Sequence, residues 1–183
     1  TYDLCGVPYS LLNQFHVEGG RPVQIAPANL DESTYTLHDI IDIRNSLRSA
    51  AVVFKDTLRK WGPDEKIPLI SHAAEVGLLL IMADRPRNVV VAGLLHDFLE
   101  GYAEGQVSAL ENLVIKYGPE VQSLVRRITE PNRIQVHGMA EESRESWLTR
   151  KLTIVQRVIE GDSEFAELVA ATKISTLAAG NKM

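Results

Sequence analysis

Apolar side chains recur every three to four residues along most of the chain after residue 35, which is the spacing of one face of an α-helix. The first such segment begins at Thr36, where Asp39 completes a pattern similar to a capping box. It continues through Leu58 to a predicted stop at Gly62-Pro63. Similar patterns predict further helices at about 70–83, 88–100, 108–117, 119–130, 139–160 and 165–179.

The segment from Asn88 to Glu100 is the most apolar part of the chain. Its β-branched run, Val89 to Val91, would also suit a strand, but its length and its helical neighbours favour a buried central helix. The sequence contains no Gly-rich phosphate loop, no internal repeat and no alternating strands joined by hairpin turns. We therefore expect an all-α bundle that builds its sites from side chains on facing helices.

Residues 1–35 follow a different pattern from the rest of the chain. They include Gly6, Pro8, Gly19-Gly20, Pro22 and Pro27 without a sustained helical period, which predicts an irregular amino-terminal arm. The predicted organisation is this arm at 1–35 and a single helical domain at 36–183. The arm is also a candidate for contacts between copies in a homo-oligomer.

Composition narrows the class of protein. A chain of 183 residues with 45% hydrophobic residues can bury a core without disulfides, and its one cysteine, Cys5, favours a reducing, cytoplasmic setting. The apolar runs fall well short of the roughly 20 residues that span a bilayer, so we expect no membrane segment. A net charge of −5 without a dense basic stripe argues against nucleic acid as a partner.

His96 and Asp97 lie together at the end of the apolar segment. An Asp in that position needs a partner, because burying an unpaired charge is costly. Glu100 follows on a neighbouring helical surface, and His72 would supply a second imidazole if its helix packs antiparallel to this one. Two imidazoles and a carboxylate suit a transition-metal ion that activates water for attack on a phosphoryl group. The His-Asp dipeptide by itself fits a structural ion pair equally well.

A series of short motifs extends from residue 59 to residue 129. It consists of a basic pair, a first histidine, an apolar run ending in Leu-Leu-His-Asp, a glutamate three residues later, and an aromatic-Gly pair before an amphipathic segment: Arg59-Lys60, Leu69–His72, Gly93–Asp97, Glu100, Tyr117-Gly118 and Val121–Thr129. This order and spacing resemble the HD-domain metal-dependent phosphohydrolases. The resemblance is closest to the RelA/SpoT-type hydrolases of guanosine tetraphosphate (ppGpp) and their small stand-alone relatives, and it implies an HD-domain-like helical bundle.

The resemblance implies roles for four residues. His72, His96 and Asp97 would bind a divalent metal ion, typically manganese in this family, and Glu100 would position or protonate at the reacting phosphate. The implied function is a metal-dependent phosphohydrolase of a nucleotide pyrophosphate or phosphate ester, similar to the guanosine 3′,5′-bis(diphosphate) 3′-pyrophosphohydrolases. The implied partner is therefore a small-molecule nucleotide.

Basic residues provide candidate contacts to that nucleotide. Arg59 and Lys60 stand where the family's basic pair approaches the substrate, although their spacing to His72 differs by two residues, and a solvated helix end would also explain them. Other cations could reach a phosphate or simply lie on solvated helix faces: Arg126, Arg127, Arg150 and Lys151.

The chain departs from the family pattern at three polar positions. Gly101 replaces the second acid after the glutamate, Thr172 replaces an Asp that is the fourth metal ligand, and Thr176 replaces an Asn that contacts the nucleotide. A hydroxyl is a poorer ligand than a carboxylate for a hard divalent ion. Glu75 could substitute for the missing ligand or be an exposed, salt-bridged residue. The alternative function is therefore a catalytically inactive HD-fold protein that binds a nucleotide or a protein partner.

Overall fold

The computed structural model of the protein describes residues 17–18, 21–22, 34–61, 65–100, 104–130 and 144–180. The chain divides into two units, Thr1–Thr34 and Tyr35–Met183. In the first unit, β1 (Val17–Glu18) pairs antiparallel with β2 (Arg21–Pro22). The predicted division into an arm at 1–35 and a domain at 36–183 stays a prediction, because most of residues 1–35 lie outside the described part.

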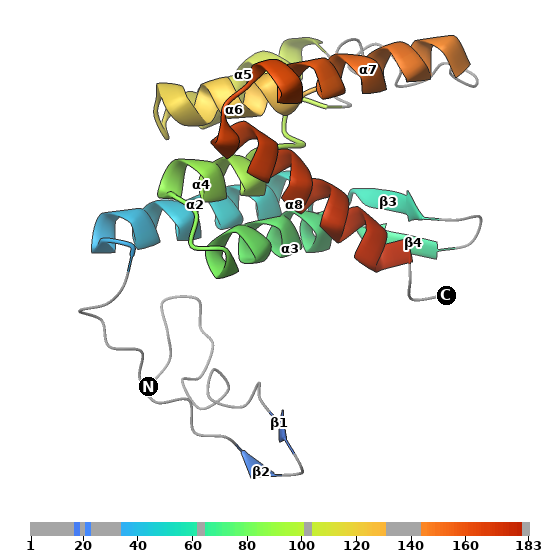
Figure 1. The fold of residues 1–183 in the computed structure, drawn as a ribbon. Helices are drawn as coiled ribbons and strands as arrows, with labels where there is room; N and C mark the ends of the chain where they lie inside the picture. Colours follow the sequence, from blue (N-terminus) through green and yellow to red (C-terminus); the bar gives the residue numbers. More distant parts are fainter. Residues whose placement is uncertain are drawn as a thin grey trace. The chain divides into compact units, whose positions relative to one another are not determined.

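The second unit is built from helices (Figure 1). They are α2 (Leu37–Val53), α3 (Leu69–Met82), α4 (Arg87–Leu95), α5 (Glu104–Ile115), α6 (Pro119–Ile128), α7 (Arg144–Glu160) and α8 (Ser163–Gly180). An antiparallel hairpin of β3 (Leu58–Trp61) and β4 (Glu65–Pro68) joins α2 to α3. The predicted all-α class is therefore confirmed.

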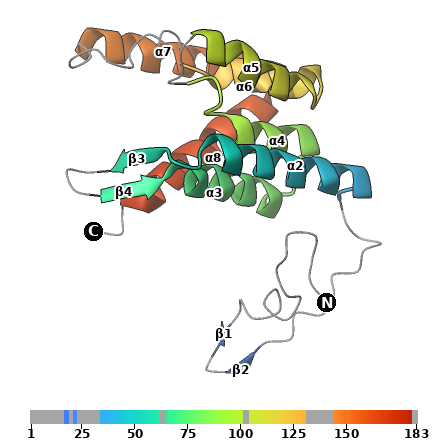
Figure 2. The ribbon, with the colours of Figure 1, turned by 180° about the vertical axis from the view of Figure 1, so that it is seen from behind.

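The most apolar segment forms the centre of this unit, as predicted. Every residue from Val89 to Leu95 of α4 is buried, and α4 packs against α2, α3, α6 and α8. Figures 1 and 2 show α4 between the α2–α3 pair and the group of α5, α6 and α7. An edge-to-face contact between Phe54 and Phe98, with ring centroids 5.3 Å apart, extends the core beyond the end of α4.

Two glycines allow α3 and α4 to approach closely. A Cβ atom on Gly77 would lie 2.6 Å from Leu94 Cδ2, and one on Gly93 would lie 2.5 Å from Leu80 Cδ1. Both distances are shorter than van der Waals contact between carbon atoms, so a larger side chain at either position would push the helices apart. The close crossing also brings the imidazole rings of His72 and His96 together, with centroids 5.1 Å apart.

The β3–β4 hairpin corrects the sequence prediction, which expected a continuous helix to Gly62 and no hairpin. The capping box of Thr36 and Asp39 starts α2 as predicted, but the helix ends at Val53. Arg59 pairs with Ile67 in the ladder, and the Leu69 N–H donates to Thr57 O at 2.9 Å. The predicted extension of the helix rested on Leu58, which continues the helical spacing of apolar residues. In the hairpin, hydrogen bonds between the strands satisfy the backbone groups that helical hydrogen bonds would satisfy.

The predicted helix at 88–100 is also shorter than expected. After Leu95 the chain continues in tight turns, in which Phe98 N–H donates to Leu95 O at 2.9 Å and Glu100 N–H donates to Asp97 O at 3.1 Å. The chain therefore leaves the helix where its polar residues begin. These residues lie on consecutive turns instead of at helical intervals: His96, Asp97 and Glu100.

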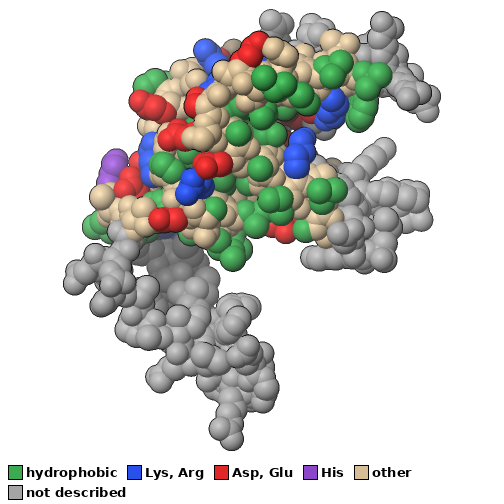
Figure 3. All heavy atoms as spheres, in the orientation of Figure 1, with side chains coloured by type: hydrophobic (Ala, Val, Ile, Leu, Met, Phe, Trp, Pro, Cys, Tyr) green, Lys and Arg blue, Asp and Glu red, His purple; other side chains and the backbone are tan. Residues whose placement is uncertain are grey.

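The surface of the described residues contains a mixture of side-chain types. On the face drawn in Figure 3, acidic and basic side chains are interspersed among apolar ones. Among the described residues, none of the helices is both long and apolar enough to span a bilayer. The expectation that nucleic acid is not a partner stays a prediction.

The α3–α4 crossing can be tested with Gly77→Val. The added side chain must displace Leu94, and we expect a loss of about 1–3 kcal/mol in the free energy of unfolding, measured by urea denaturation. Ala51→Val at an exposed position of α2 is the control for placing the same branched side chain in a helix. Equal stability of the two variants would contradict the close packing described here.

Candidate metal centre

A cavity of about 160 Å³ lies where α3, the end of α4, the end of α6, α7 and α8 meet. Its apolar wall includes Ile128, Ile154 and Val169, and polar side chains from the same elements form the rest of its lining. A site of this kind, with a few polar groups converging from separate helices, is typical of ligand and metal sites in helical folds.

Three of the predicted site residues come together at this cavity. His72 is in the first turn of α3 and is 6% exposed, whereas His96 follows α4 and is 5% exposed. One ligand atom from each of them and one from Asp97 all lie within 4.8 Å of one another. The expectation that the two helices bring their histidines together therefore agrees with the geometry, although metal binding by these residues stays a prediction.

The His96 ring is oriented by a backbone hydrogen bond. Its Nδ1 lies 2.8 Å from Gly93 O, near the carboxyl end of α4, where carbonyl groups lack helical partners. A carbonyl oxygen can only accept, so Nδ1 carries a proton, and in the neutral ring the lone pair is on Nε2. Nε2 lies 3.3 Å from Asp97 Oδ1. A lone pair facing a carboxylate is repulsive unless a proton or a metal cation lies between them.

These donors fit a divalent metal ion. Two imidazoles and one carboxylate make up a set of three protein ligands, which catalytic metal sites use when they keep further positions open for water and substrate. Thr172 lines the same cavity, and its hydroxyl donates to Val169 O at 2.7 Å. The position therefore contributes a neutral oxygen where the family pattern has a carboxylate.

Glu100 also lines the cavity and is held by the backbone. Its Oε1 accepts a hydrogen bond of 3.1 Å from Glu130 N–H. The Glu130 side chain is buried and forms ion pairs with Arg150 and Lys151 of α7. This cluster ties α7 to the end of α6. Removing one partner would leave a buried charge unpaired, which is costly. Two members of this cluster, Glu130 and Lys151, also line the cavity.

The predicted basic contacts have different outcomes. Arg59 and Lys60 lie in β3, so the interpretation as a solvated helix end is wrong, because the backbone there pairs with β4. Their side chains lie outside the described residues, as does Gly101, so their proposed roles stay predictions. Arg150 is 7% exposed and is not on a solvated face, whereas Arg126 is exposed and pairs with Glu111.

Sequence reasoning missed Glu130 and Ser175 as residues near the site. Glu130 follows the end of α6, where the helix dipole disfavours an anion, and this position could have indicated a need for cationic partners. Ser175 is 1% exposed and follows Leu168 and Ala171 at helical spacing, so it lies on the buried stripe of α8. A serine on that stripe indicates that its hydroxyl has a buried partner.

Comparison with known proteins identifies the family. A family model described as "HD domain" matches residues 50–177, from within α2 to within α8. The chain belongs to the HD-domain family. No curated protein matches it. A solved structure of a metazoan ortholog of SpoT that hydrolyses ppGpp is similar, with a TM-score of 0.56 and 23% sequence identity over 80% of this chain and 72% of that chain. This similarity supports the HD fold.

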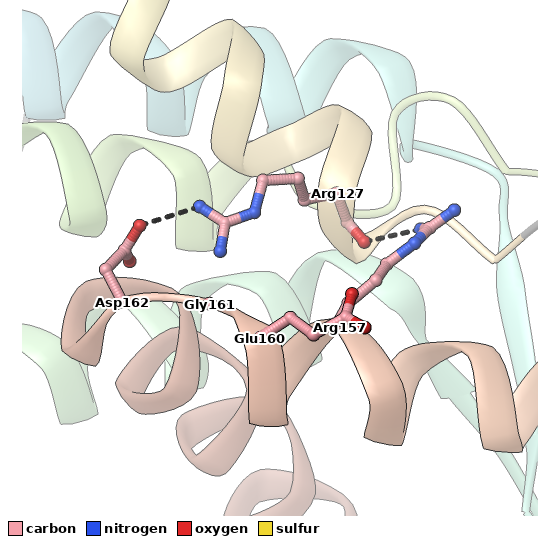
Figure 4. Close-up of a pocket in the computed structure, with 5 residues that line it drawn as sticks. All are labelled: Arg127, Arg157, Glu160, Gly161 and Asp162. Atoms are coloured by element: carbon pink, nitrogen blue, oxygen red, sulfur yellow. Dashed lines mark hydrogen bonds and ion pairs between the residues drawn. The ribbon is translucent and has the colours of Figure 1, made fainter.

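This HD domain has a second hollow, an open groove of about 580 Å³ beside the start of α8 (Figure 4). Arg127 donates to Asp162 at 2.9 Å and stacks over Phe165, with its guanidinium carbon 4.3 Å from the ring centroid. Arg157 donates to two backbone carbonyls, Arg127 O and Thr129 O, at 2.6 and 2.9 Å. The Arg127 contacts anchor the start of α8, which provides one wall of the metal-centre cavity, to α6, and the Arg157 contacts anchor α7 to the end of α6.

Asp162 also caps α8 and gives a test of this anchoring. Hydrogen bonding from Phe165 N–H and then from Arg127 lowers the pKa of Asp162. The stabilisation is therefore present above the pKa of Asp162 in the unfolded chain and is lost as pH falls through the lower folded pKa. We expect Asp162→Asn to reduce the free energy of unfolding at neutral pH by about 0.3–1 kcal/mol, since the ion pair is exposed.

The measurement is urea denaturation of the HD domain as a function of pH. The difference between wild type and Asp162→Asn is expected to disappear in acid. Asp56→Asn at an exposed position makes the same change of charge without a helix cap and is expected to have little effect at any pH. A pH-independent difference for Asp162→Asn would rule out the charge as its cause.

Proposed function

We propose that this HD domain is a metal-dependent phosphohydrolase of a nucleotide pyrophosphate or phosphate ester. Guanosine 3′,5′-bis(diphosphate) is the first substrate to test, because the similar metazoan structure belongs to a protein that hydrolyses ppGpp. Manganese is the first metal to test. We propose a reducing, cytoplasmic setting, which the single cysteine favours.

The observation that carries the proposal is the convergence of His72, His96 and Asp97 on one cavity. Their ligand atoms lie within 4.8 Å of one another, and the bond from His96 Nδ1 to Gly93 O directs the other ring nitrogen toward Asp97. These residues would hold a divalent ion, whose positive charge would acidify water and polarise a phosphoryl oxygen.

Residues around the metal centre supply the remaining functions. Glu100, held by Glu130 N–H, is the proposed proton donor or acceptor at the reacting phosphate. Lys151 and Lys173 line the same cavity and place positive charge near the phosphoryl oxygens. Arg59 and Lys60 of β3 are the proposed contacts to the rest of the nucleotide.

A second candidate function is binding without turnover. Thr172 lines the cavity with a hydroxyl that donates to Val169 O, and Thr176 donates to Thr172 O at 2.8 Å. At the two α8 positions where the family pattern has a carboxylate ligand and an amide, the chain therefore has neutral hydroxyl groups. A protein with this site could bind a nucleotide through its cations and leave it intact.

Metal binding is the first test of the proposal. We expect protein purified without chelators to contain metal and to bind manganese in a titration, and Asp97→Ala to bind much less because it removes the only carboxylate of the three donors. Thr172→Asp is expected to bind more tightly than wild type. Asp56→Ala is the control for losing a carboxylate elsewhere on the surface.

The two candidate functions give different results. Metal in wild type together with release of phosphate or pyrophosphate supports the enzyme, and metal or nucleotide binding without turnover supports the alternative. No metal in either wild type or Thr172→Asp would contradict the metal centre and leave His96 and Asp97 as a structural ion pair.

Glu100→Gln tests the role of the cavity glutamate. The amide oxygen can still accept from Glu130 N–H, but the side chain can no longer transfer a proton, so kcat should fall by roughly 10²- to 10⁴-fold. Manganese affinity should stay close to that of wild type. A kcat equal to wild type in a metal-loaded Glu100→Gln protein would remove Glu100 from the chemistry.

A further inference from the structure

We propose that Glu75 and Ser175 form a positioning relay that holds His72 with a proton on Nδ1 and its Nε2 lone pair directed at the metal centre. The proposal rests on the metal centre described under Proposed function. It concerns two residues outside the proposed ligand set, and it joins α3 to α8 at the first turn of α3.

The relay consists of two consecutive hydrogen bonds. His72 Nδ1 lies 2.8 Å from Ser175 Oγ, and Ser175 Oγ donates to Glu75 Oε2 at 2.8 Å. Ser175 is 1% exposed and His72 is 6% exposed, so the central part of the relay is shielded from water. Glu75 is half-buried on α3, one turn after His72.

The direction of each proton follows from the number of donors. An ionised carboxylate only accepts hydrogen bonds, so the single Ser175 hydroxyl proton points to Glu75. The Ser175 oxygen must then accept from His72, which requires a proton on Nδ1. In the neutral ring this leaves the lone pair on Nε2. The opposite tautomer would leave Nδ1 facing a hydroxyl oxygen without a proton between them.

His96 reaches the same tautomer by a different route, through its bond to Gly93 O. Both imidazoles are therefore prepared to offer Nε2 before any metal binds. Outer hydrogen bonds that orient a ligating histidine typically contribute 10- to 100-fold to metal affinity. We expect this contribution to matter here because Thr172 leaves the centre with three strong donors.

The relay therefore gives a specific role to Glu75, which the sequence also allowed as an exposed, salt-bridged residue. Glu75 does not line the cavity, so it acts through Ser175 and is not a direct replacement for the fourth ligand. Its negative charge, transmitted through the hydroxyl, favours the donating form of His72 Nδ1.

The first experiment reads the tautomer in the metal-free protein. Two-bond ¹H–¹⁵N NMR spectra of the histidine rings at alkaline pH distinguish a proton on Nδ1 from one on Nε2. We expect His72 to carry its proton on Nδ1 in wild type and to lose this preference in Ser175→Ala. Ser46→Ala removes a similarly buried helix hydroxyl, one that donates to Ile43 O, and should leave His72 unchanged.

Glu75→Leu tests the carboxylate itself. We expect it to shift the His72 tautomer in the same direction as Ser175→Ala, because the hydroxyl loses the acceptor that fixes its proton. An unchanged tautomer in Ser175→Ala, or a proton on Nε2 in wild type, would overturn the relay. An unchanged tautomer in Glu75→Leu alone would remove Glu75 from it.

Manganese titration provides the second readout. Ser175→Ala should weaken binding by about 10- to 100-fold, with Ser46→Ala equal to wild type. Equal affinity of Ser175→Ala and wild type would overturn the positioning role while leaving the metal centre intact. If wild type bound no manganese, the proposed function would fail, and the NMR result would still decide whether the relay exists.

Discussion

The close crossing of α3 and α4 is the constraint on which both the core and the candidate site depend. Gly77 and Gly93 bring the helices nearer than any larger residue would permit, so Leu94 and Leu80 fill the space that Cβ atoms would occupy. The same approach places His72 and His96 with their rings 5.1 Å apart. One contact between the two helices therefore determines both the packing of the core and the spacing of the candidate ligands.

The buried charge of Glu130 beside the candidate site is paired. Glu130 is 5% exposed, and both Arg150 and Lys151 pair with it, which offsets the cost of desolvating three charged groups. The backbone N–H of the same Glu130 holds Glu100 at the cavity. The ion-pair cluster thus ties α7 to the core and also fixes the position of the proposed catalytic carboxylate.

Local patterns predicted those parts of the protein that local interactions determine. The capping box at Thr36, the buried α4 and the all-α class follow from residues close together in sequence. The β3–β4 hairpin did not, because its strands are stabilised by each other rather than by their own periodicity. Likewise, Ser175 lies 100 residues from Glu75 and 103 from His72, so no local pattern could reveal their contact.

The second imidazole favours the proposed metal centre over a structural ion pair. A protonated His96 could donate to Gly93 O from Nδ1 and to Asp97 from Nε2, and the distances of that pair alone suit either interpretation. Such a pair does not explain why His72, whose ring is anchored through Nδ1, contributes to the same group of possible ligand atoms. A second cationic imidazole there would repel the first. On the proposed function, one divalent ion shared by two neutral rings and a carboxylate would account for all three.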